Sequence, residues 1–205
     1  MVTITRLFDD YSEAEQAVRD LEAQGIPHSD LSVISSNADE RHGVYERTDE
    51  NDVAEGLGRG AVGGAIIGGG AGLLAGLGML AIPGIGPIVA AGWLAATAVG
   101  AGVGAAGGAA AGGIIGALIE GGHSEEEAHI YSEGVRRGGT IVSVRVNDGR
   151  VTEVEEILRR HHGVDADARG RAYRETGWSS FDENAPPYTR EEIAAERERY
   201  RGRDI

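Results

Sequence analysis

The sequence predicts an α+β protein in which a split β-α-β (ferredoxin-like) sheet domain is interrupted by a glycine-zipper α-helical hairpin. The sheet domain is predicted because the order strand, helix, strand occurs near the start of the chain and again around residue 150. The hairpin is predicted by residues 60–119, which contain no charged side chain and carry glycine at every fourth position from 60 to 76 and again from 100 to 116. We expect the first half of the sheet domain at 1–35, an acidic linker at 36–58, the hairpin at 59–120, a helix with the second half of the domain at 121–169, and a C-terminal tail with a short helix at 170–205.

The first half of the sheet domain begins with residues 2–8, which are mostly β-branched or apolar and therefore favour a strand. Ser12 and Glu15 have the spacing of a capping box, in which each side chain satisfies a free backbone N–H at the start of a helix. Gly25 is expected to end this helix. The apolar run at 31–34 then predicts the second strand.

The second half repeats this order. Residues 140–146 place Val at alternate positions, which is the period of a half-buried strand. Thr152 and Glu155 have the spacing of another capping box, and Gly163 is expected to stop the helix that follows. Residues 164–168 alternate again and predict the last strand.

Two further helices are expected. Ser124 and Glu127 form a third potential capping box for a helix that ends at the glycine pair 138–139. A charged helix follows Thr189 in the tail. The tail aromatics, among them Trp178, predict either an irregular segment with a few anchoring contacts or a recognition motif for a partner.

The central segment contains two glycine ladders that are related about a proline-glycine turn. Glycine at every fourth position removes the side chains from one side of a helix and lets a second helix approach closely. The predicted helix-packing residues are Gly60, Gly64, Gly68, Gly72 and Gly76 in the first ladder and Gly100, Gly104, Gly108, Gly112 and Gly116 in the second. The predicted hairpin turn consists of Pro83, Gly84, Gly86 and Pro87.

Glycine inside a helix costs about 1 kcal/mol relative to alanine, so ten ladder glycines disfavour helix in water by roughly 10 kcal/mol. Close packing in an apolar medium offsets this cost. Residues 60–82 and 88–119 each exceed the approximately 20 residues that span a bilayer, which favours a membrane hairpin. In the alternative, the hairpins of several soluble chains pack together.

The charge of the chain narrows the choice of partner. The formal net charge is −14, so a nucleic acid would be repelled and is not expected as a partner. The first residues lack the apolar core of a secretory signal, so the flanks are expected to face the cytoplasm from the cytoplasmic membrane, or the whole chain to be cytoplasmic. We expect membrane association, self-association, and a protein partner of the sheet domain whose identity the sequence does not specify.

No constellation in the sequence indicates an enzyme, a cofactor or a metal site. The chain has no cysteine. His123 and His129 are six residues apart, and His161 and His162 are expected to point to different sides of a helix end, so none has the spacing of metal ligands. The glycines lack the Gly-Lys-Ser/Thr of a phosphate loop. The sequence therefore predicts a non-catalytic protein, with an enzyme whose site lies in the sheet domain as the weaker alternative.

Several stretches resemble a known family. Residues 3–35, the glycine ladders and the stretch GGTIVSVRVNDGRVTEVEEILRRHHGVDA look like the bacterial general stress protein, or heat-induced stress protein, family. The likeness runs over residues 2–169 and extends to the tail stretch GWSSFDENAPPYT. It implies a bacterial stress-response protein of undetermined biochemical activity, and it implies no catalytic residues.

Overall fold

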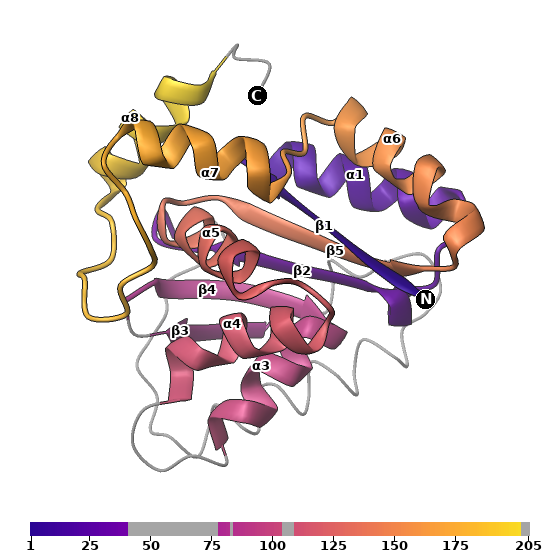
Figure 1. The fold of residues 1–205 in the computed structure, drawn as a ribbon, viewed down its shortest axis with the longest axis horizontal. Helices are drawn as coiled ribbons and strands as arrows, with labels where there is room; N and C mark the ends of the chain where they lie inside the picture. The colour runs from indigo at the N-terminus through magenta and orange to yellow at the C-terminus, as the bar shows by residue number, and fades with distance from the viewer. Residues whose placement is uncertain (41–77, 83, 104–108, 202–205) are drawn as a thin grey trace.

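The computed structural model describes residues 1–40, 78–82, 84–103 and 109–201. Within these residues, a five-stranded antiparallel sheet lies between two layers of helices (Figure 1). The order of the strands is β1-β5-β2-β4-β3. The strands are β1 (Val2–Phe8), β2 (Leu31–Ser36), β3 (Gly78–Ile82), β4 (Gly86–Gly92) and β5 (Thr140–Val146).

The helices cover both faces of the sheet. Helices α1 and α6 pack on one face around Phe8, Leu21 and Leu158, whereas α3, α4, α5 and α7 pack on the other around Leu94, Ile114 and related residues. The helices are α1 (Tyr11–Ala23), η1 (His28–Asp30), α3 (Trp93–Val103), α4 (Ala109–Glu120), α5 (Glu125–Arg136), η3 (Asp148–Arg150), α6 (Val151–Arg160), α7 (Ala166–Glu175) and α8 (Arg190–Tyr200).

The predicted capping boxes have different outcomes. Ser124 and Glu127 form the predicted box at the start of α5. The box predicted at Ser12 and Glu15 is wrong, because α1 begins at Tyr11, two residues earlier than a cap at Ser12 implies, and its cap is Asp10, which accepts a hydrogen bond from the Ser12 N–H at 3.1 Å. The box at Thr152 is also wrong, because η3 runs directly into α6 and no side chain caps that helix. Spacing alone does not show where a helix begins.

The predicted strands from the two parts of the chain interleave in the sheet. Strand β5 lies between β1 and β2, and both pairings are antiparallel. The last predicted strand, at 164–168, is wrong beyond its first residue: Val164 makes one bridge with Leu7, and α7 begins at Ala166. Asp165 accepts a hydrogen bond from the Ala168 N–H at 2.7 Å, and this cap turns the chain out of the sheet.

The described residues on both sides of the proline-glycine turn are strands, so the prediction of two helices joined by this turn is wrong there. Gly84 and Gly86 have φ values of 75° and 99°, as a tight turn requires, and Pro83 lies outside the described residues. Strand β4 pairs with the open edge of β2, where the Asn37 N–H donates to the Pro87 carbonyl at 2.8 Å. This edge gives a glycine-rich segment backbone partners without the cost of a helix.

The predicted second arm, 88–119, is not one helix but comprises β4, α3 and α4. Helices α3 and α4 lie side by side and bury Leu94, Ile114 and Leu118 against the sheet (Figure 1). Among the helices that the structure describes, none has the length and apolar character needed to cross a bilayer. The acidic linker after residue 40 and the first arm up to residue 77 lie outside the described residues.

Candidate functional site at the edge of strand β1

Of the predicted helix-packing glycines, three lie in described helices. Gly100 is in α3, and Gly112 and Gly116 are in α4. Gly116 is exposed, and a Cβ atom added there would meet open space. The close approach between the two helices occurs instead at Gly113, where an added Cβ would lie 2.7 Å from the Ala98 carbonyl oxygen. The first ladder (Gly60, Gly64, Gly68, Gly72 and Gly76) and Gly104 and Gly108 lie outside the described residues.

We expect Gly116→Ala to stabilise the protein by about 1 kcal/mol, because alanine favours a helix and the site has room for the methyl group. Urea denaturation followed by circular dichroism measures the change. Gly113→Ala is the matched control and should destabilise the fold. A loss of stability in Gly116→Ala would mean that a neighbouring helix packs on this residue.

The turn residues contact the C-terminal tail. A Cβ atom on Gly84 would lie 2.5 Å from the Glu183 carbonyl oxygen, and one on Gly86 would lie 3.1 Å from Pro187 Cβ. Pro87 lies in β4 and contributes its carbonyl to the pairing with β2. The turn therefore forms part of the surface on which residues 183–187 pack.

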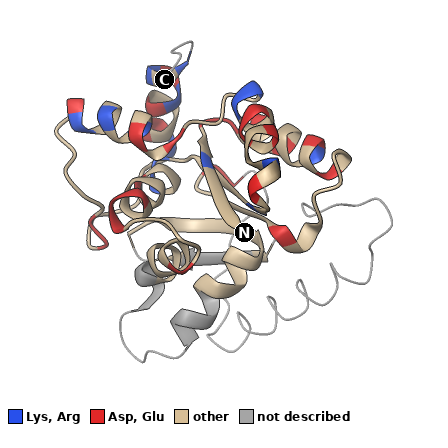
Figure 2. Ribbon diagram, turned by 45° about the vertical axis from the view of Figure 1, so that its right-hand side comes forward, with Lys and Arg blue, Asp and Glu red and all other residues tan. Residues whose placement is uncertain are grey.

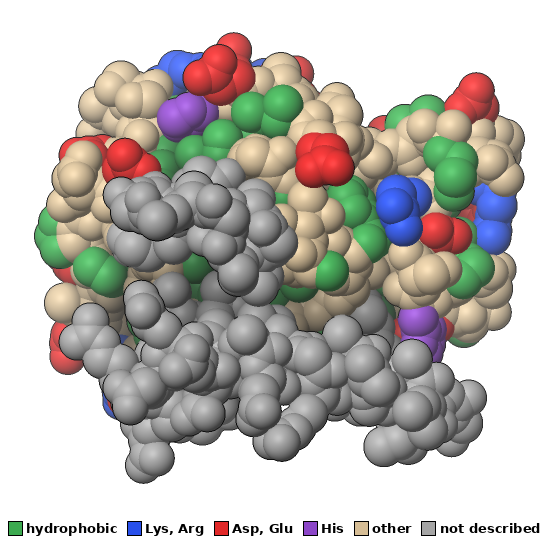
Figure 3. All heavy atoms as spheres, turned by 90° about the horizontal axis from the view of Figure 1, so that it is seen from below, with side chains coloured by type: hydrophobic (Ala, Val, Ile, Leu, Met, Phe, Trp, Pro, Cys, Tyr) green, Lys and Arg blue, Asp and Glu red, His purple; other side chains and the backbone are tan. Residues whose placement is uncertain are grey.

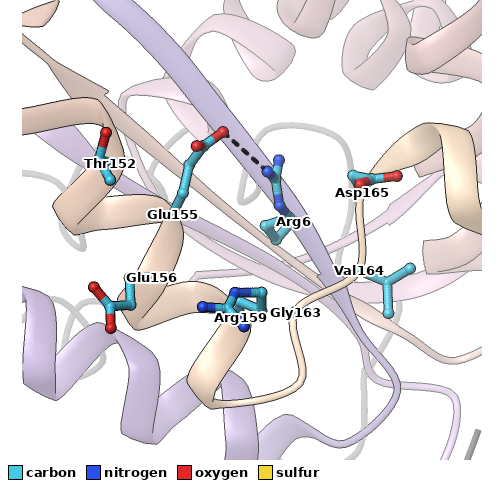
Figure 4. Close-up of a pocket in the computed structure, with 8 residues that line it drawn as sticks. All are labelled: Arg6, Thr152, Glu155, Glu156, Arg159, Gly163, Val164 and Asp165. Carbon is cyan, nitrogen blue, oxygen red and sulfur yellow. Dashed lines mark hydrogen bonds and ion pairs between the residues drawn. The ribbon is translucent and has the colours of Figure 1, made fainter. Parts of the chain in front are cut away.

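A pocket of about 320 Å³ lies beside β1, between α6 and the turn that precedes α7 (Figure 4). Because the chain leaves the sheet at Asp165, no described strand continues the pairing along the outer edge of β1. Figure 4 shows the side chains from α6 on one side of the pocket and Val164 and Asp165 on the other. The pocket is lined by Arg6, Thr152, Glu155, Glu156, Arg159, Gly163, Val164 and Asp165.

Arg6 extends from β1 into this pocket and makes two polar contacts. Its Nη2 donates to Glu155 Oε1 at 3.2 Å, and its Nη1 donates to the Thr5 carbonyl at 2.9 Å. The guanidinium thus covers the backbone at the edge of the strand. The side chains of Arg6 and Glu155 are 19% and 47% exposed, so their ion pair is in contact with water.

On the opposite face of β1, a hydrogen-bonded network joins the sheet to α5. Thr5 Oγ1 lies 2.7 Å from His123 Nε2 and 2.8 Å from Ser143 Oγ. The Tyr131 hydroxyl donates to the Thr5 carbonyl at 2.7 Å. His123 Nδ1 lies 3.9 Å from the Glu127 carboxylate. The network therefore fixes the loop between α4 and α5 to β1 and β5, at one side of the sheet.

A hydroxyl, an imidazole and a carboxylate occur here in the order of a nucleophilic triad, but the geometry favours a structural role. Thr5 and Ser143 are buried at 1% and 0% exposure, so a substrate has no direct path to either hydroxyl. The distance of 3.9 Å between His123 and Glu127 is also too long for the hydrogen bond that orients a catalytic histidine. The arrangement joins β1 to α5 and to the loop that precedes it.

Burial lowers the pKa of His123, which the charge of Glu127 opposes and that of Arg6 reinforces. The unfolded chain then takes up the proton at a higher pH than the folded chain does, so this histidine makes stability fall as pH drops below 6.5. We expect urea denaturation at pH 7.5 and 5.5 to show a larger loss for the wild type than for His123→Gln. Equal losses would contradict a buried, neutral His123.

The other histidines considered in the sequence lie apart from this network. His161 Nε2 contacts Asp20 at 2.8 Å, and His162 Nδ1 contacts Glu13 at 2.9 Å, so both link α6 to α1. His129 lies 3.9 Å from Glu125. Within the described ranges, no three side chains of metal-binding type come together.

A cluster of buried charges under the C-terminal helices was not predicted. Glu133 has no exposed area and lies 2.8 Å from Arg136 Nη2 and 2.6 Å from Arg137 Nε. Arg137 Nη1 also contacts Glu196 of α8 at 2.9 Å. The glutamate–arginine spacings of three and four residues on α5 are a sequence signal for such pairs, but they do not reveal that the pairs are buried.

Arg169 of α7 is part of the same region. It is fully buried, its Nη2 donates to Asp9 Oδ2 at 2.6 Å, and its guanidinium lies 4.2 Å from the centre of the Tyr200 ring. Asp9 also receives a hydrogen bond from Arg197 at its carbonyl, at 3.2 Å. The tail is therefore fixed to the end of β1 by polar contacts, which goes beyond the few anchoring contacts expected for it.

The comparison with known proteins supports the stress protein family over part of the chain. Residues 3–75 match the family model described as the heat induced stress protein YflT domain. This match includes β1, α1 and β2 but not the second β-α half or the tail. No curated protein and no solved structure matches the chain.

Proposed function

We propose that this chain is a non-catalytic stress-response protein that self-associates through its glycine-rich segment and presents its α+β domain to a protein partner. The match of residues 3–75 to a heat-induced stress protein domain supports the stress-response role. The observation that carries self-association is the first glycine ladder, because residues 60–77 have no charged side chain and place glycine at every fourth position.

The second ladder contributes less to this proposal. The described apolar side chains of the helices that carry it, such as Leu94 of α3 and Ile114 of α4, are already buried in the chain's own core. The charged residues of the described part lie mainly on α1, α5, α6, α7 and α8 (Figure 2). Seen from below, the visible hydrophobic side chains of the described residues occur in small groups separated by backbone and by other side chains (Figure 3). Association between chains is therefore assigned to the first ladder.

Attachment to the cytoplasmic membrane, with the flanks in the cytoplasm, is the second candidate. It is favoured by the same lack of charge in residues 60–77. The length of this segment is also close to the approximately 20 residues that cross a bilayer. In a cytoplasmic assembly residues 60–77 would contact other chains, whereas in a membrane-bound chain they would contact lipid. Measuring particle mass and vesicle binding therefore separates the two candidates.

The test uses the full chain and the variant Gly68→Leu. Light scattering without detergent gives the particle mass, and flotation with phosphatidylethanolamine–phosphatidylglycerol vesicles measures membrane binding. We expect the wild-type protein to form particles larger than the 21.3 kDa chain, and the variant Gly68→Leu to form smaller particles. The matched control is Gly149→Leu, at an exposed glycine with no neighbour within 4 Å of an added Cβ, and it should leave the mass unchanged.

Each result decides between the candidates. Wild-type chain that floats with the vesicles and is monomeric without them would support membrane attachment instead. Wild-type chain that stays monomeric and does not float would contradict both. A mass that Gly149→Leu reduces as much as Gly68→Leu does would show that the effect is not specific to the ladder.

We also propose that the sheet domain is a variant of the split β-α-β arrangement, extended by β3 and β4. The spatial order Val164, β1, β5, β2 supports this proposal, since it places the second-half strands beside and between those of the first half. Hydrogen exchange tests it. The amides of Leu7 and Val164 should be protected together, and exchange of Val164 at the rate of an exposed loop amide would contradict it.

A further inference from the structure

Residues 178–201 form a C-terminal strap, an irregular stretch that leads into α8. Arg197 of α8 makes the central contacts of this strap. Its Nε donates to the Asp9 carbonyl after β1, at 3.2 Å, and its Nη2 donates to the Gly138 carbonyl after α5, at 3.1 Å. Its Nη1 lies 3.3 Å from Asp39 Oδ2, beyond the end of β2. A single side chain thus joins the strap to the ends of β1, β2 and α5.

Beneath the strap, arginine side chains stack on aromatic rings. The Arg137 guanidinium lies 4.2 Å from the centre of the Tyr173 ring of α7 and 5.6 Å from that of the Tyr188 ring of the strap. Its Nη1 also contacts Glu196 Oε2 of α8 at 2.9 Å. We call the part of this region outside the strap the arginine surface, which consists of the buried side chains of Arg136, Arg137, Arg169 and Tyr173. This surface binds a carboxylate and aromatic rings together.

Few apolar side chains hold the strap in place. Those that are buried, among the described residues, are Phe181, Ile193 and Tyr200, whereas each face of the sheet packs a larger apolar cluster. Arg169 Nε and Nη1 and the Tyr200 hydroxyl are buried and have no hydrogen-bond partner within the described part of the chain. Opening of the strap returns such groups to water, which removes the cost of burying them unpaired. The strap should therefore open at a lower free energy than the sheet unfolds.

The chain that connects α7 to α8 is long enough to carry a released α8 away from the domain. Residues 176–189 form neither helix nor strand, and Figure 1 shows them as a wide loop beside the helices. Pro186 and Pro187 favour an extended backbone in the residues that precede them. Fully extended, this stretch spans about 46–50 Å. A released strap can therefore reach a neighbouring molecule.

We propose that the strap detaches as a unit before the sheet unfolds, and that the strap of a second copy of the chain then occupies the arginine surface. A second copy is the expected occupant because its strap carries Glu196 and Tyr188 at the spacing that this surface already binds. Exchange keeps each contact of the strap and changes only the chain that supplies it. The inference rests on these contacts and does not depend on association through residues 60–77.

The two tryptophans of the chain report separately on the strap and on the sheet domain. Trp178 of the strap packs edge-on against Tyr173, with ring centres 5.6 Å apart, whereas Trp93 begins α3. Urea titration of the full chain, followed by fluorescence, is carried out with Trp93→Phe and with Trp178→Phe, which leave one tryptophan each. We expect the Trp178 signal to change at a lower urea concentration than the Trp93 signal. Coincident midpoints would overturn release of the strap as a unit.

Exchange is tested by fluorescence anisotropy with a labelled peptide of residues 178–201 and the full chain. Glu196→Gln in the chain weakens its own strap, because Arg137 loses a charged partner, while the wild-type peptide still supplies Glu196. We expect the peptide to bind this variant about tenfold more tightly than the wild-type chain. Glu198→Gln is the matched control on the same helix. Its side chain is 69% exposed, so it should bind the peptide as the wild type does.

A peptide that itself carries Glu196→Gln should lose the tenfold gain. Equal binding of the wild-type peptide to the Glu196→Gln and Glu198→Gln chains, or equal binding of the two peptides, would overturn exchange. Every chain in this series also carries Gly68→Leu, so the outcome does not depend on whether the first ladder associates. Thermal unfolding verifies that each variant is folded, and Arg197→Gln replaces Glu196→Gln in both chain and peptide if the latter chain is not.

Discussion

Gly92→Ala is expected to destabilise the protein by about 2–6 kcal/mol, made up of about 1–3 for backbone strain and about 1–3 for steric overlap. Gly92 ends β4 with a φ of 90°, and an added Cβ would lie 2.2 Å from the Leu31 carbonyl oxygen and 2.7 Å from Ser32 Cα. Both neighbours are backbone atoms of β2, so no side-chain rotation relieves the overlap. Urea denaturation followed by tryptophan fluorescence measures the loss.

Gly25→Ala is the matched control for this prediction. Gly25 also has a positive φ, of 81°, but an added Cβ there has no neighbour within 4 Å. It should therefore show the backbone strain without the overlap. If both variants lose the same stability, the close approach of β2 to β4 at Gly92 contributes nothing.

Glu133→Gln is expected to cost about 3–5 kcal/mol, which is the range for breaking a buried ion pair. The carboxylate lies in the interior between Arg136 and Arg137, and the substitution leaves two guanidinium groups there with less compensating charge. Burial works to lower the pKa of Arg137, but the hydrogen bond and charge of Glu133 raise it, so the group stays charged. Thermal and urea unfolding both measure the effect.

Glu126→Gln on the same helix is the control. The Glu126 side chain is 70% exposed and pairs with Arg174 at the surface, so its loss should change stability by less than about 1 kcal/mol. A result for Glu133→Gln as small as that for Glu126→Gln would mean that water reaches the cluster.

Much of the sheet domain follows from local patterns. The alternation in residues 140–146 predicted β5 with its observed bounds, and the expected end of the first helix at Gly25 is confirmed by its positive φ. The hairpin of β3 and β4 was missed because a short apolar run such as 78–82 has no period that separates strand from helix. What decides its structure is the open edge of β2, which only the folded sheet provides.

The pocket at β1 depended on a feature that sequence alone did not reveal. Alternation in 164–168 predicted a strand, but Asp165 caps a helix that begins at Ala166. Only Val164 therefore pairs with β1 at this edge among the described residues. The contact of Glu196 with Arg137 joins residues 59 positions apart and could not be found from spacing. By contrast, Ser124 and Glu127 are local neighbours, and their box was predicted correctly.

The contacts of Asp9 have a consequence for synthesis. Its partner Arg169 lies 160 residues later in the sequence, and its partner Arg197 lies 188 residues later. At about 5–20 residues per second, the first strand is made roughly 10–40 s before the arginine of the last helix. While the chain is still bound to the ribosome, β1 is present but Arg169 and Arg197, which contact Asp9 at its end, have not yet been made. The native contacts of Asp9 therefore form only after Arg197 has been synthesised.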